Sequence, residues 1–315
     1  HDALPIFRNF KSGYKGCIAI LYSSSNSLLC SICNRIKEVI SVSGWNKNLA
    51  SIWTNNVAPS RPSNAEMCVY TKYLRELQSQ CGQRIKMLVL GSTPEFRDWG
   101  FEQAIDISVV DKSIEYHKCI SREIRHKNIK ESVYVQNWEE MTFDKQFDLI
   151  IGDLAIGNVD PDLFHVFLQN VNKSLSKNGF FLGKSLIWDE NELIKSPTEI
   201  IDDYRLQNYI HPYTFINHRL GLYCLDRNTN TLDFSIMFNE LKKLYENGYI
   251  DQQLFSYFTD VGWSTEMKFK FFAPTQKQFI DCVNQELQFV KFEHTEDCYT
   301  NVFPIYVIKK GGYFK

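Results

Sequence analysis

Short apolar segments alternate with helical patterns through the middle of this chain, and this alternation is the strongest constraint on its fold. Runs this short suit strands that are buried on both faces of a sheet. Strands that alternate with helices over about 100 residues indicate a parallel, doubly wound sheet, and therefore an α/β fold. The predicted strands are Met87–Leu90, Ile105–Val110, Ser132–Val135, Phe147–Ile151 and Phe180–Leu182.

Helix signals fill the gaps between these strands, and we expect helices over residues 94–103, 113–125 and 161–175. Thr93 precedes Pro94, which suits the first position of a helix because its fixed φ is already helical. Asp160 caps the third helix, and Asn178-Gly179 predicts its end. A further helix begins at Ser63, where Ser63 and Glu66 have the spacing of a capping box.

The segment before this helix, residues 1–62, is predicted to be an N-terminal cap with a strand at Gly16–Tyr22. Cys30 and Cys33 follow within a helical pattern, without a second cysteine or histidine pair, so we interpret them as core thiols and expect no metal site. The nine scattered cysteines favour free thiols in a reducing compartment, and no signal peptide is recognisable. A cytoplasmic location is therefore expected.

Residues 190–268 interrupt the alternation and are predicted to be a mostly helical insertion after the fifth strand. Beyond it, Thr275–Glu286 has a helical pattern, and Phe289–Phe292 and Val302–Ile308 are predicted strands. Their connection is too short for a crossover, so they should be antiparallel neighbours. The core of the protein is therefore expected over residues 63–189 and 269–315.

The charge of the chain argues against some partners. Its 35 basic and 37 acidic residues give a net charge of −2, so no excess of positive charge is present to hold a nucleic acid. The longest apolar run, Cys17–Tyr22, is far shorter than the ~20 residues that a membrane helix needs. We therefore expect neither a membrane nor a nucleic acid as partner.

The carboxyl ends of the predicted strands carry residues that suit a nucleotide-type cofactor, because ligands bind at this edge of an open parallel sheet. Gly91 allows a tight turn and a close backbone approach. Asp111, twenty residues later, can accept the hydroxyls of a ribose. Asn137 and Trp138 can offer an amide to an adenine edge and a ring to its face, and Asp153 places a carboxylate in the cleft.

Each of these residues also has a structural alternative. A single glycine after a strand is common, Asp111 could cap the next helix, Trp138 could be a core residue, and Asp153 could order a loop. The glycine-rich G-x-G-x-x-G loop of NAD and FAD proteins is missing, and so is the P-loop of ATPases. These absences lower the expectation of a dehydrogenase or an ATPase.

Two motifs lie beside these residues: Arg61-Pro62-Ser63, and a first loop that reads Leu-Gly-x-Thr-Pro-Glu-x-Arg-Asp from Leu90 to Asp98. With them the chain resembles the class I S-adenosylmethionine-dependent methyltransferases, and more narrowly a branch of mostly uncharacterised prokaryotic methyltransferases. The resemblance covers residues 61–189 and 271–309. It implies a Rossmann-like sheet of seven strands whose last strand is antiparallel, with S-adenosylmethionine as cofactor.

The resemblance also implies roles for individual residues. Gly91 and the backbone of Ser92 and Thr93 would hold the methionine part of the cofactor. The ribose and adenine would be bound by Asp111, Lys112, Asn137 and Trp138. The methyl-transfer face would be lined by Asp153, the candidate catalytic residue. The cofactor carboxylate would pair with Arg61 and Arg97, although both arginines could instead bridge surface acids. The chain departs from the family pattern in having one glycine in the first loop and Asn137 where an acidic residue is common.

The acceptor is expected to be a small organic molecule, because the insertion is rich in aromatic residues and could cover the cleft. The same aromatics, Tyr204, Tyr209, Tyr213, Phe215 and Tyr223, could equally form the insertion's own core. His211, His218 and Tyr213 are further candidates for a general base.

Two alternatives to this function stay open. Lys184 on the fifth strand, with Asp153, is similar to part of the lysine–aspartate set of RNA ribose 2′-O-methyltransferases. The reduced first loop is also consistent with a non-catalytic, cofactor-binding scaffold. The Asn-Pro-Pro-Tyr motif of adenine or amide methylation is absent after the fourth strand. The sequence names neither the acceptor nor the oligomeric state.

Overall fold

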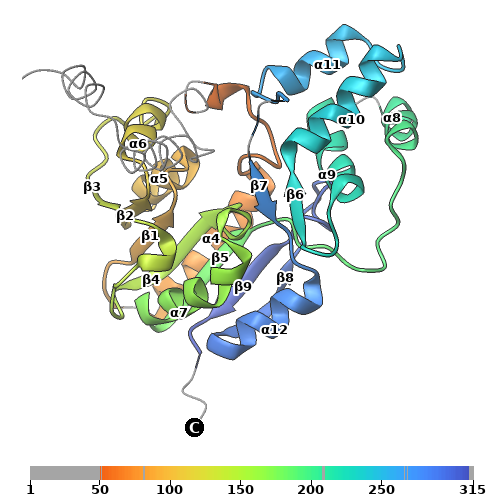
Figure 1. The fold of residues 1–315 in the computed structure, drawn as a ribbon. Coiled ribbons are helices and arrows are strands. Elements are labelled where there is room, and N and C mark those ends of the chain that lie inside the picture. The colour runs from red at the N-terminus through yellow and green to blue at the C-terminus, as the bar shows by residue number, and fades with distance from the viewer. Residues whose placement is uncertain are drawn as a thin grey trace, which may run out of the picture. The chain divides into compact units, whose positions relative to one another are not determined.

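Seven strands form one sheet in the order β3-β2-β1-β4-β5-β9-β8 (Figure 1). Strands β1 to β5 are parallel, whereas β9 pairs antiparallel with both β5 and β8. The Rossmann-like sheet with an antiparallel last strand, expected from the sequence, is confirmed. Its strands are β1 (Lys86–Leu90), β2 (Asp106–Asp111), β3 (Glu131–Val135), β4 (Phe147–Asp153), β5 (Leu175–Lys184), β8 (Gln288–Glu293) and β9 (Ile305–Lys309).

This computed structural model describes residues 50, 52–80, 82–207, 210–265, 267 and 269–311. The predicted strand Gly16–Tyr22 and the Cys30–Cys33 pair lie outside the described residues. Among the described helices, none has the length and apolar character needed to cross a membrane.

Helices cover both faces of the sheet because alternate strand residues point to opposite sides. Leu88 and Ile150 belong to a buried cluster with residues of α7 and α12. Val89 and Ile151, one position further along the same strands, pack with α4 and α5 instead. The helices of the core are α4 (Asn64–Gln80), α5 (Pro94–Glu102), α6 (Ile114–Ile120), α7 (Phe164–Ser174) and α12 (Gln276–Glu286).

The starts of α4, α5, α6 and α12 agree with the sequence, whereas the predicted start at Pro161 falls in a 3₁₀ helix, η4 (Pro161–Leu163), and α7 begins at Phe164. Ser63 and Glu66 form the predicted capping box, with bonds of 2.9 and 3.1 Å between backbone and side chain. Helix α6 is shorter than predicted and ends at Ile120. The predicted end of α7 at residue 175 is one residue from its observed end at Ser174, but the interpretation of Asn178-Gly179 as a stop signal is wrong, because both residues lie within β5. Gly179 serves close packing there: a Cβ would lie 3.1 Å from the Phe147 carbonyl oxygen.

The segment between Trp188 and Thr275, called the insertion from here on, extends past the predicted residues 190–268 to include β7 (Lys270–Phe272). It contains four helices and a two-stranded ribbon among its described residues. The elements are α8 (Pro197–Leu206), α9 (Pro212–Cys224), β6 (Thr231–Asp233), α10 (Phe234–Glu246), α11 (Gln252–Thr259) and β7 (Lys270–Phe272), with β6 and β7 antiparallel. Its helices gather beside the sheet, away from α7 and α12 (Figure 1). Tyr213 and Phe215 belong to a hydrophobic cluster that the insertion shares with core residues such as Tyr299 and Phe303, and Tyr204 packs against it. Tyr209 lies outside the described residues.

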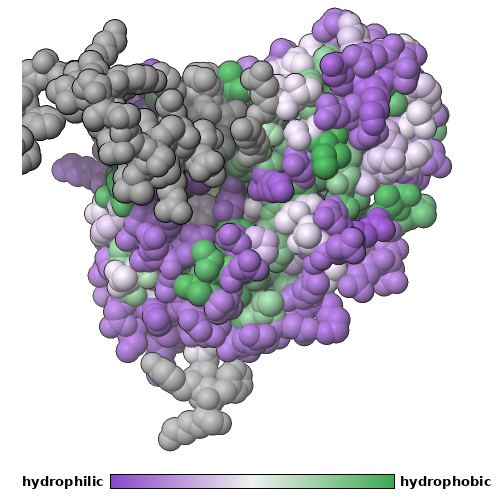
Figure 2. Space-filling model, viewed as in Figure 1, coloured by the Kyte–Doolittle hydropathy of each residue, from purple (hydrophilic) through white to green (hydrophobic). Residues whose placement is uncertain are grey.

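The two ends of the insertion meet beside the sheet. Trp188 forms an isolated parallel bridge with Thr275, and its indole nitrogen donates to the Ala273 carbonyl over 3.1 Å. On the face drawn in Figure 2 the surface is largely hydrophilic, with hydrophobic side chains in small separate groups. Leu193 and Leu206, both in the insertion, are the most exposed large apolar side chains among the described residues.

Candidate functional site

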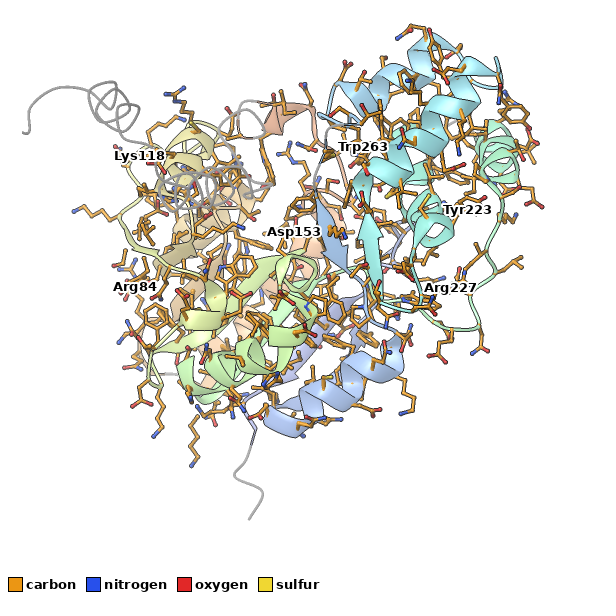
Figure 3. The ribbon with its side chains drawn as sticks, viewed as in Figure 1. Arg84, Lys118, Asp153, Tyr223, Arg227 and Trp263 are labelled. Atoms are coloured by element: carbon orange, nitrogen blue, oxygen red, sulfur yellow. The ribbon has the colours of Figure 1, made fainter. Side chains whose placement is uncertain are left out.

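A cavity lies at the carboxyl ends of β1, β2, β3 and β4, and holds about 820 Å³ including its open mouth. The lining consists of residues 90–93, 111, 112, 116, 136–139, 153, 154 and 158, with Trp53 and Ser60 from the segment before α4. Asp153, at the end of β4, is labelled in Figure 3. The site therefore falls where an open α/β sheet places its ligands.

The first loop turns sharply at Gly91, which adopts a φ of 82°. Glycine reaches this left-handed region without steric cost, whereas other residues are strained there. The Gly91 amide donates to the Val110 carbonyl over 2.8 Å, and the Trp138 indole nitrogen donates to the same carbonyl over 3.1 Å. Trp138 begins a short 3₁₀ helix, η2 (Trp138–Glu140). Its ring lies beside Gly91 and forms a wall of the cavity.

Asp111 ends β2 as a buried carboxylate that lines the cavity. Its Oδ2 accepts a 2.7 Å hydrogen bond from the Ser92 hydroxyl, and its Oδ1 accepts a 2.9 Å bond from the Ser113 amide. Burial raises the pKa of Asp111 above its ordinary value, although the hydrogen bond from Ser92 acts in the opposite direction. Each oxygen keeps a lone pair for a ligand hydroxyl.

Asp153 ends β4 and reaches the cavity from a second strand end. Its side chain is 3% exposed, and its Oδ1 lies 3.4 Å from Lys184 Nζ without forming a hydrogen bond to any described residue. Lys184 in turn donates to Glu66 over 2.6 Å and to the Arg61 carbonyl over 3.0 Å. Burial raises the pKa of Asp153 to about 7, against the attraction of the Lys184 ammonium. A carboxyl group with this pKa can exchange a proton near neutral pH.

The turn after Asp153 is strained. Leu154 has a φ of 55°, which is uncommon for a residue with a branched side chain, and its amide donates to the Lys184 carbonyl over 2.9 Å. The 3₁₀ helix η3 (Ile156–Asn158) follows directly. Gly157 in η3 leaves space for the Phe271 ring of β7, since a Cβ there would lie 1.8 Å from a ring carbon. The ribbon of the insertion therefore packs against the loop that presents Asp153.

The structure brings eight of the ten predicted cofactor-binding residues to this one cavity. They are Gly91, Ser92, Thr93, Asp111, Lys112, Asn137, Trp138 and Asp153. The two arginines do not line it. Arg61 pairs with Glu95, and the buried Arg97 pairs with Glu131 and donates to Ser121 Oγ over 2.8 Å. Both arginines therefore bridge acidic side chains, as the alternative interpretation expects.

None of the other candidates for a general base lines the cavity. His218 is buried and bonded to the Thr214 carbonyl, and burial lowers its pKa to about 3. Tyr213 is buried in the cluster that the insertion shares with the core, where burial raises its pKa to about 12, and its hydroxyl bonds to Ser60 over 2.7 Å. His211 packs on the Tyr257 ring. Of the described residues between 190 and 268, none lines the cavity, and Tyr223, Arg227 and Trp263 are drawn on the insertion, away from Asp153 (Figure 3).

Sequence reasoning missed several residues of the lining. Gln136 and Glu139 flank the predicted Asn137-Trp138 pair. Their closeness along the chain could have predicted that they line the cavity. Tyr116 lies one turn into the helix after Asp111. Trp53, in the 3₁₀ helix η1 (Trp53–Asn55), gives no such signal, because only the tertiary fold brings its segment to the cavity.

Comparison by sequence finds no match, either to a family model or to a curated protein. Solved structures do share the fold. A protein from Rhodobacter sphaeroides assigned as a Zn-dependent alcohol dehydrogenase is 13% identical, with a TM-score of 0.50 over 85% of this chain and 99% of that chain. This likeness is one of fold alone.

Two further matches have lower scores. A SAM-dependent methyltransferase from Methanosarcina mazei is 12% identical, with a TM-score of 0.44 over 74% of this chain and 95% of that chain. An N-methyltransferase from Bradyrhizobium japonicum, in complex with S-adenosyl-L-homocysteine, is 10% identical, with a TM-score of 0.43 over 85% of this chain and 100% of that chain.

Proposed function

We propose that this protein is an S-adenosylmethionine-dependent methyltransferase that acts on a small organic acceptor. The observation that carries the proposal is the convergence of Gly91, Asp111, Trp138 and Asp153, from four successive strand ends, on one cavity. The strand order supports it, because the antiparallel β9 next to β5 is the arrangement that the sequence resemblance implies.

The residues present suit the cofactor. Asp111 would accept hydrogen bonds from the ribose hydroxyls, and the Trp138 ring would stack on the adenine, with Asn137 at its edge. The first loop, Gly91 to Thr93, would hold the methionine part. The lining is also acidic on balance, with Asp111, Glu139 and Asp153 against Lys112. Negative charge suits a cofactor with a sulfonium cation and an ammonium group.

Asp153 is the proposed catalytic residue. The cofactor, when bound, supplies an activated methyl group, and the protein must align the acceptor and exclude water. An acceptor N–H or O–H beside Asp153 would donate to its carboxylate, which lines the cavity. As the acceptor atom forms its bond to carbon, its proton passes to this carboxylate. General-base assistance of this kind contributes about 10²- to 10⁴-fold to a rate.

The acidic lining favours a small acceptor over RNA. Lys184, the residue that is similar to a ribose 2′-O-methyltransferase lysine, is fully buried and donates to Glu66 and the Arg61 carbonyl. It therefore stands behind Asp153 rather than in the lining. A polyanion would also meet the carboxylates of Glu139 and Asp153 without a matching set of cations, which opposes binding.

Calorimetric titration of S-adenosylmethionine and S-adenosylhomocysteine tests the proposal. We expect micromolar binding by the parent protein and a loss of about 10- to 100-fold in Asp111→Ala, since a hydrogen bond to a charged group is removed. Asp144→Asn, an exposed carboxylate outside the cavity, is the control and should bind normally. Absence of binding by the parent protein would overturn the proposal. Binding without methyl transfer to any acceptor screened with labelled cofactor would favour the scaffold alternative.

A further inference from the structure

The hydroxyl of Ser92 lies between Asp111 and a second titratable side chain that the proposed chemistry does not use. Ser92 Oγ is 2.7 Å from Asp111 Oδ2 and 3.0 Å from His117 Nδ1, and all three side chains are buried. Serine has one hydroxyl hydrogen, and Asp111 accepts it. His117 Nδ1 must therefore donate to Ser92 Oγ, which fixes the direction of both bonds.

The imidazole of His117 is also held from its other side. Its Nε2 lies 3.4 Å from Glu131 Oε1. Glu131 is gripped by Arg97, which donates from Nε to Oε2 over 2.9 Å and pairs with Oε1 through a second nitrogen. Burial would raise the pKa of Glu131, but the hydrogen bonds from His117 and Arg97 hold it below its ordinary value.

The chain of contacts crosses five parts of the fold. It runs from Arg97 on α5 to Glu131 on β3, then to His117 on α6, to Ser92 in the first loop and to Asp111 at the end of β2. None of the first three residues lines the cavity, whereas Ser92 and Asp111 do. The contacts therefore connect the Arg97–Glu131 ion pair, outside the cavity lining, to the Asp111 carboxylate in the lining.

We infer that His117 is a positioning residue, which acts through the Ser92 hydroxyl to orient the Asp111 carboxylate for the two hydroxyls of a ribose. The inference rests on the proposed function, because the ribose belongs to the proposed cofactor. With His117 donating to it, Ser92 has only Asp111 as acceptor, so the carboxylate is held from two sides, by Ser92 at Oδ2 and the Ser113 amide at Oδ1. The remaining lone pairs are then available to a ligand in the cavity that Asp111 lines.

Two substitutions at residue 117 separate this role from a structural one. The amide nitrogen of His117→Asn replaces Nδ1 and can still donate to Ser92, whereas that of His117→Gln replaces Nε2 and can reach only Glu131. We expect His117→Gln to weaken S-adenosylhomocysteine binding about tenfold and His117→Asn to remain within about twofold of the parent. Ser92→Ala should lose a similar factor, and Ser92→Ala combined with His117→Gln should lose no more than Ser92→Ala alone.

Calorimetric affinities and unfolding midpoints are measured for the same set of variants, with His165→Gln on the exposed face of α7 as control. Analogues of S-adenosylhomocysteine that lack the 2′- or 3′-hydroxyl complete the test, because the difference between the Gln and Asn variants should shrink when a ribose hydroxyl is removed. Equal affinities of the two His117 variants, or a difference that persists with both deoxy analogues, would overturn the inference alone. Absence of binding by the parent protein would overturn the proposed function and the inference with it.

Discussion

Lys184 on β5 and Glu66 on α4 form a fully buried ion pair across 118 residues of sequence, with 2.6 Å between Nζ and Oε2. The same Glu66 oxygen accepts the Ser63 amide of the capping box over 2.9 Å, and the other oxygen accepts the Tyr299 hydroxyl over 3.0 Å. One glutamate therefore closes the first turn of α4 and also neutralises the lysine behind Asp153.

This pair predicts a strong dependence of stability on Lys184. Lys184→Met leaves the buried carboxylates of Glu66 and Asp153 without their cation, and removal of one partner of a buried ion pair costs about 3–5 kcal/mol. Urea unfolding should show a loss of this size. The double variant Lys184→Met with Glu66→Gln should recover part of it, because only one buried carboxylate then remains uncompensated. A double variant that is less stable than Lys184→Met would contradict the explanation.

Asp153→Asn should slow methyl transfer while it leaves cofactor binding nearly unchanged. The amide keeps the shape of the side chain but cannot take a proton, so we expect kcat to fall about 10²- to 10⁴-fold. In the parent protein, kcat/KM should rise with pH until about pH 7, where the carboxyl group loses its proton. Assays with an identified acceptor would measure both. A variant with full activity would exclude Asp153 as the base.

The same pKa predicts how stability changes with pH. The pKa of Asp153 is raised from 3.8 in the unfolded chain to about 7 in the fold, so the folded state binds the extra proton between these values. Its contribution is fully present below about pH 4 and is lost as the pH rises through 7, by at most about 1.4 kcal/mol per pH unit. Asp153→Asn lacks this loss. Its unfolding free energy, relative to the parent, should therefore increase from pH 5 to pH 7, whereas Asp144→Asn should show no such trend.

Trp138 predicts a graded loss of cofactor affinity. Stacking of a base on an aromatic ring is worth about 1–3 kcal/mol, so Trp138→Leu should weaken S-adenosylhomocysteine binding roughly 5- to 150-fold. Trp138→Phe keeps a ring and should lose clearly less, although both variants lack the indole bond to the Val110 carbonyl. Equal losses in the two variants would assign the effect to that hydrogen bond and not to stacking.

Gly91 offers a prediction with a matched control elsewhere in the fold. Gly91→Ala places a Cβ on a residue with a φ of 82°, which should cost about 1–2 kcal/mol of stability. Gly248 has a φ of 68°, with no atom within 4 Å of an added Cβ, and lies outside the cavity. Gly248→Ala should therefore lose similar stability but bind S-adenosylhomocysteine normally, whereas Gly91→Ala should lose both. Equal affinities in the two variants would show that the first loop does not contact the ligand.

The sheet was predictable from the sequence because parallel strands buried on both faces leave a plain pattern. Segments such as Phe147–Ile151 are apolar throughout, and the short link between the last two strands permits only an antiparallel pair. The role of Asn178-Gly179 was not predictable in this way. Asn178-Gly179 has the composition of a helix stop, but Gly179 is required by the close approach of β4, and that contact lies 32 residues away in sequence.

The site was predictable where its residues directly follow strands, as Asp111 and Asp153 do. The network around Lys184 was not, since Glu66 reaches it from a helix before the sheet and nothing in the spacing links the two. Arg97 illustrates the opposite error: an arginine near the first loop suggests a ligand carboxylate, yet Glu131 from β3 takes its guanidinium. Sequence spacing therefore predicts which residues lie at the ends of strands. It does not predict the partners of long side chains, which are brought close only by the packing of the fold.

The chain leaves the sheet at Trp188 and returns at Thr275, and a parallel bridge joins the two ends of the segment between them. This segment could be lengthened, shortened or exchanged as a unit, because domain insertions are tolerated when their two ends lie close together. The insertion contacts the Asp153 loop through Phe271 but contributes no described residue to the cavity wall. Changes of sequence there should therefore be tolerated best away from Phe271, which packs on Gly157, and Tyr213, which bonds to the cavity residue Ser60.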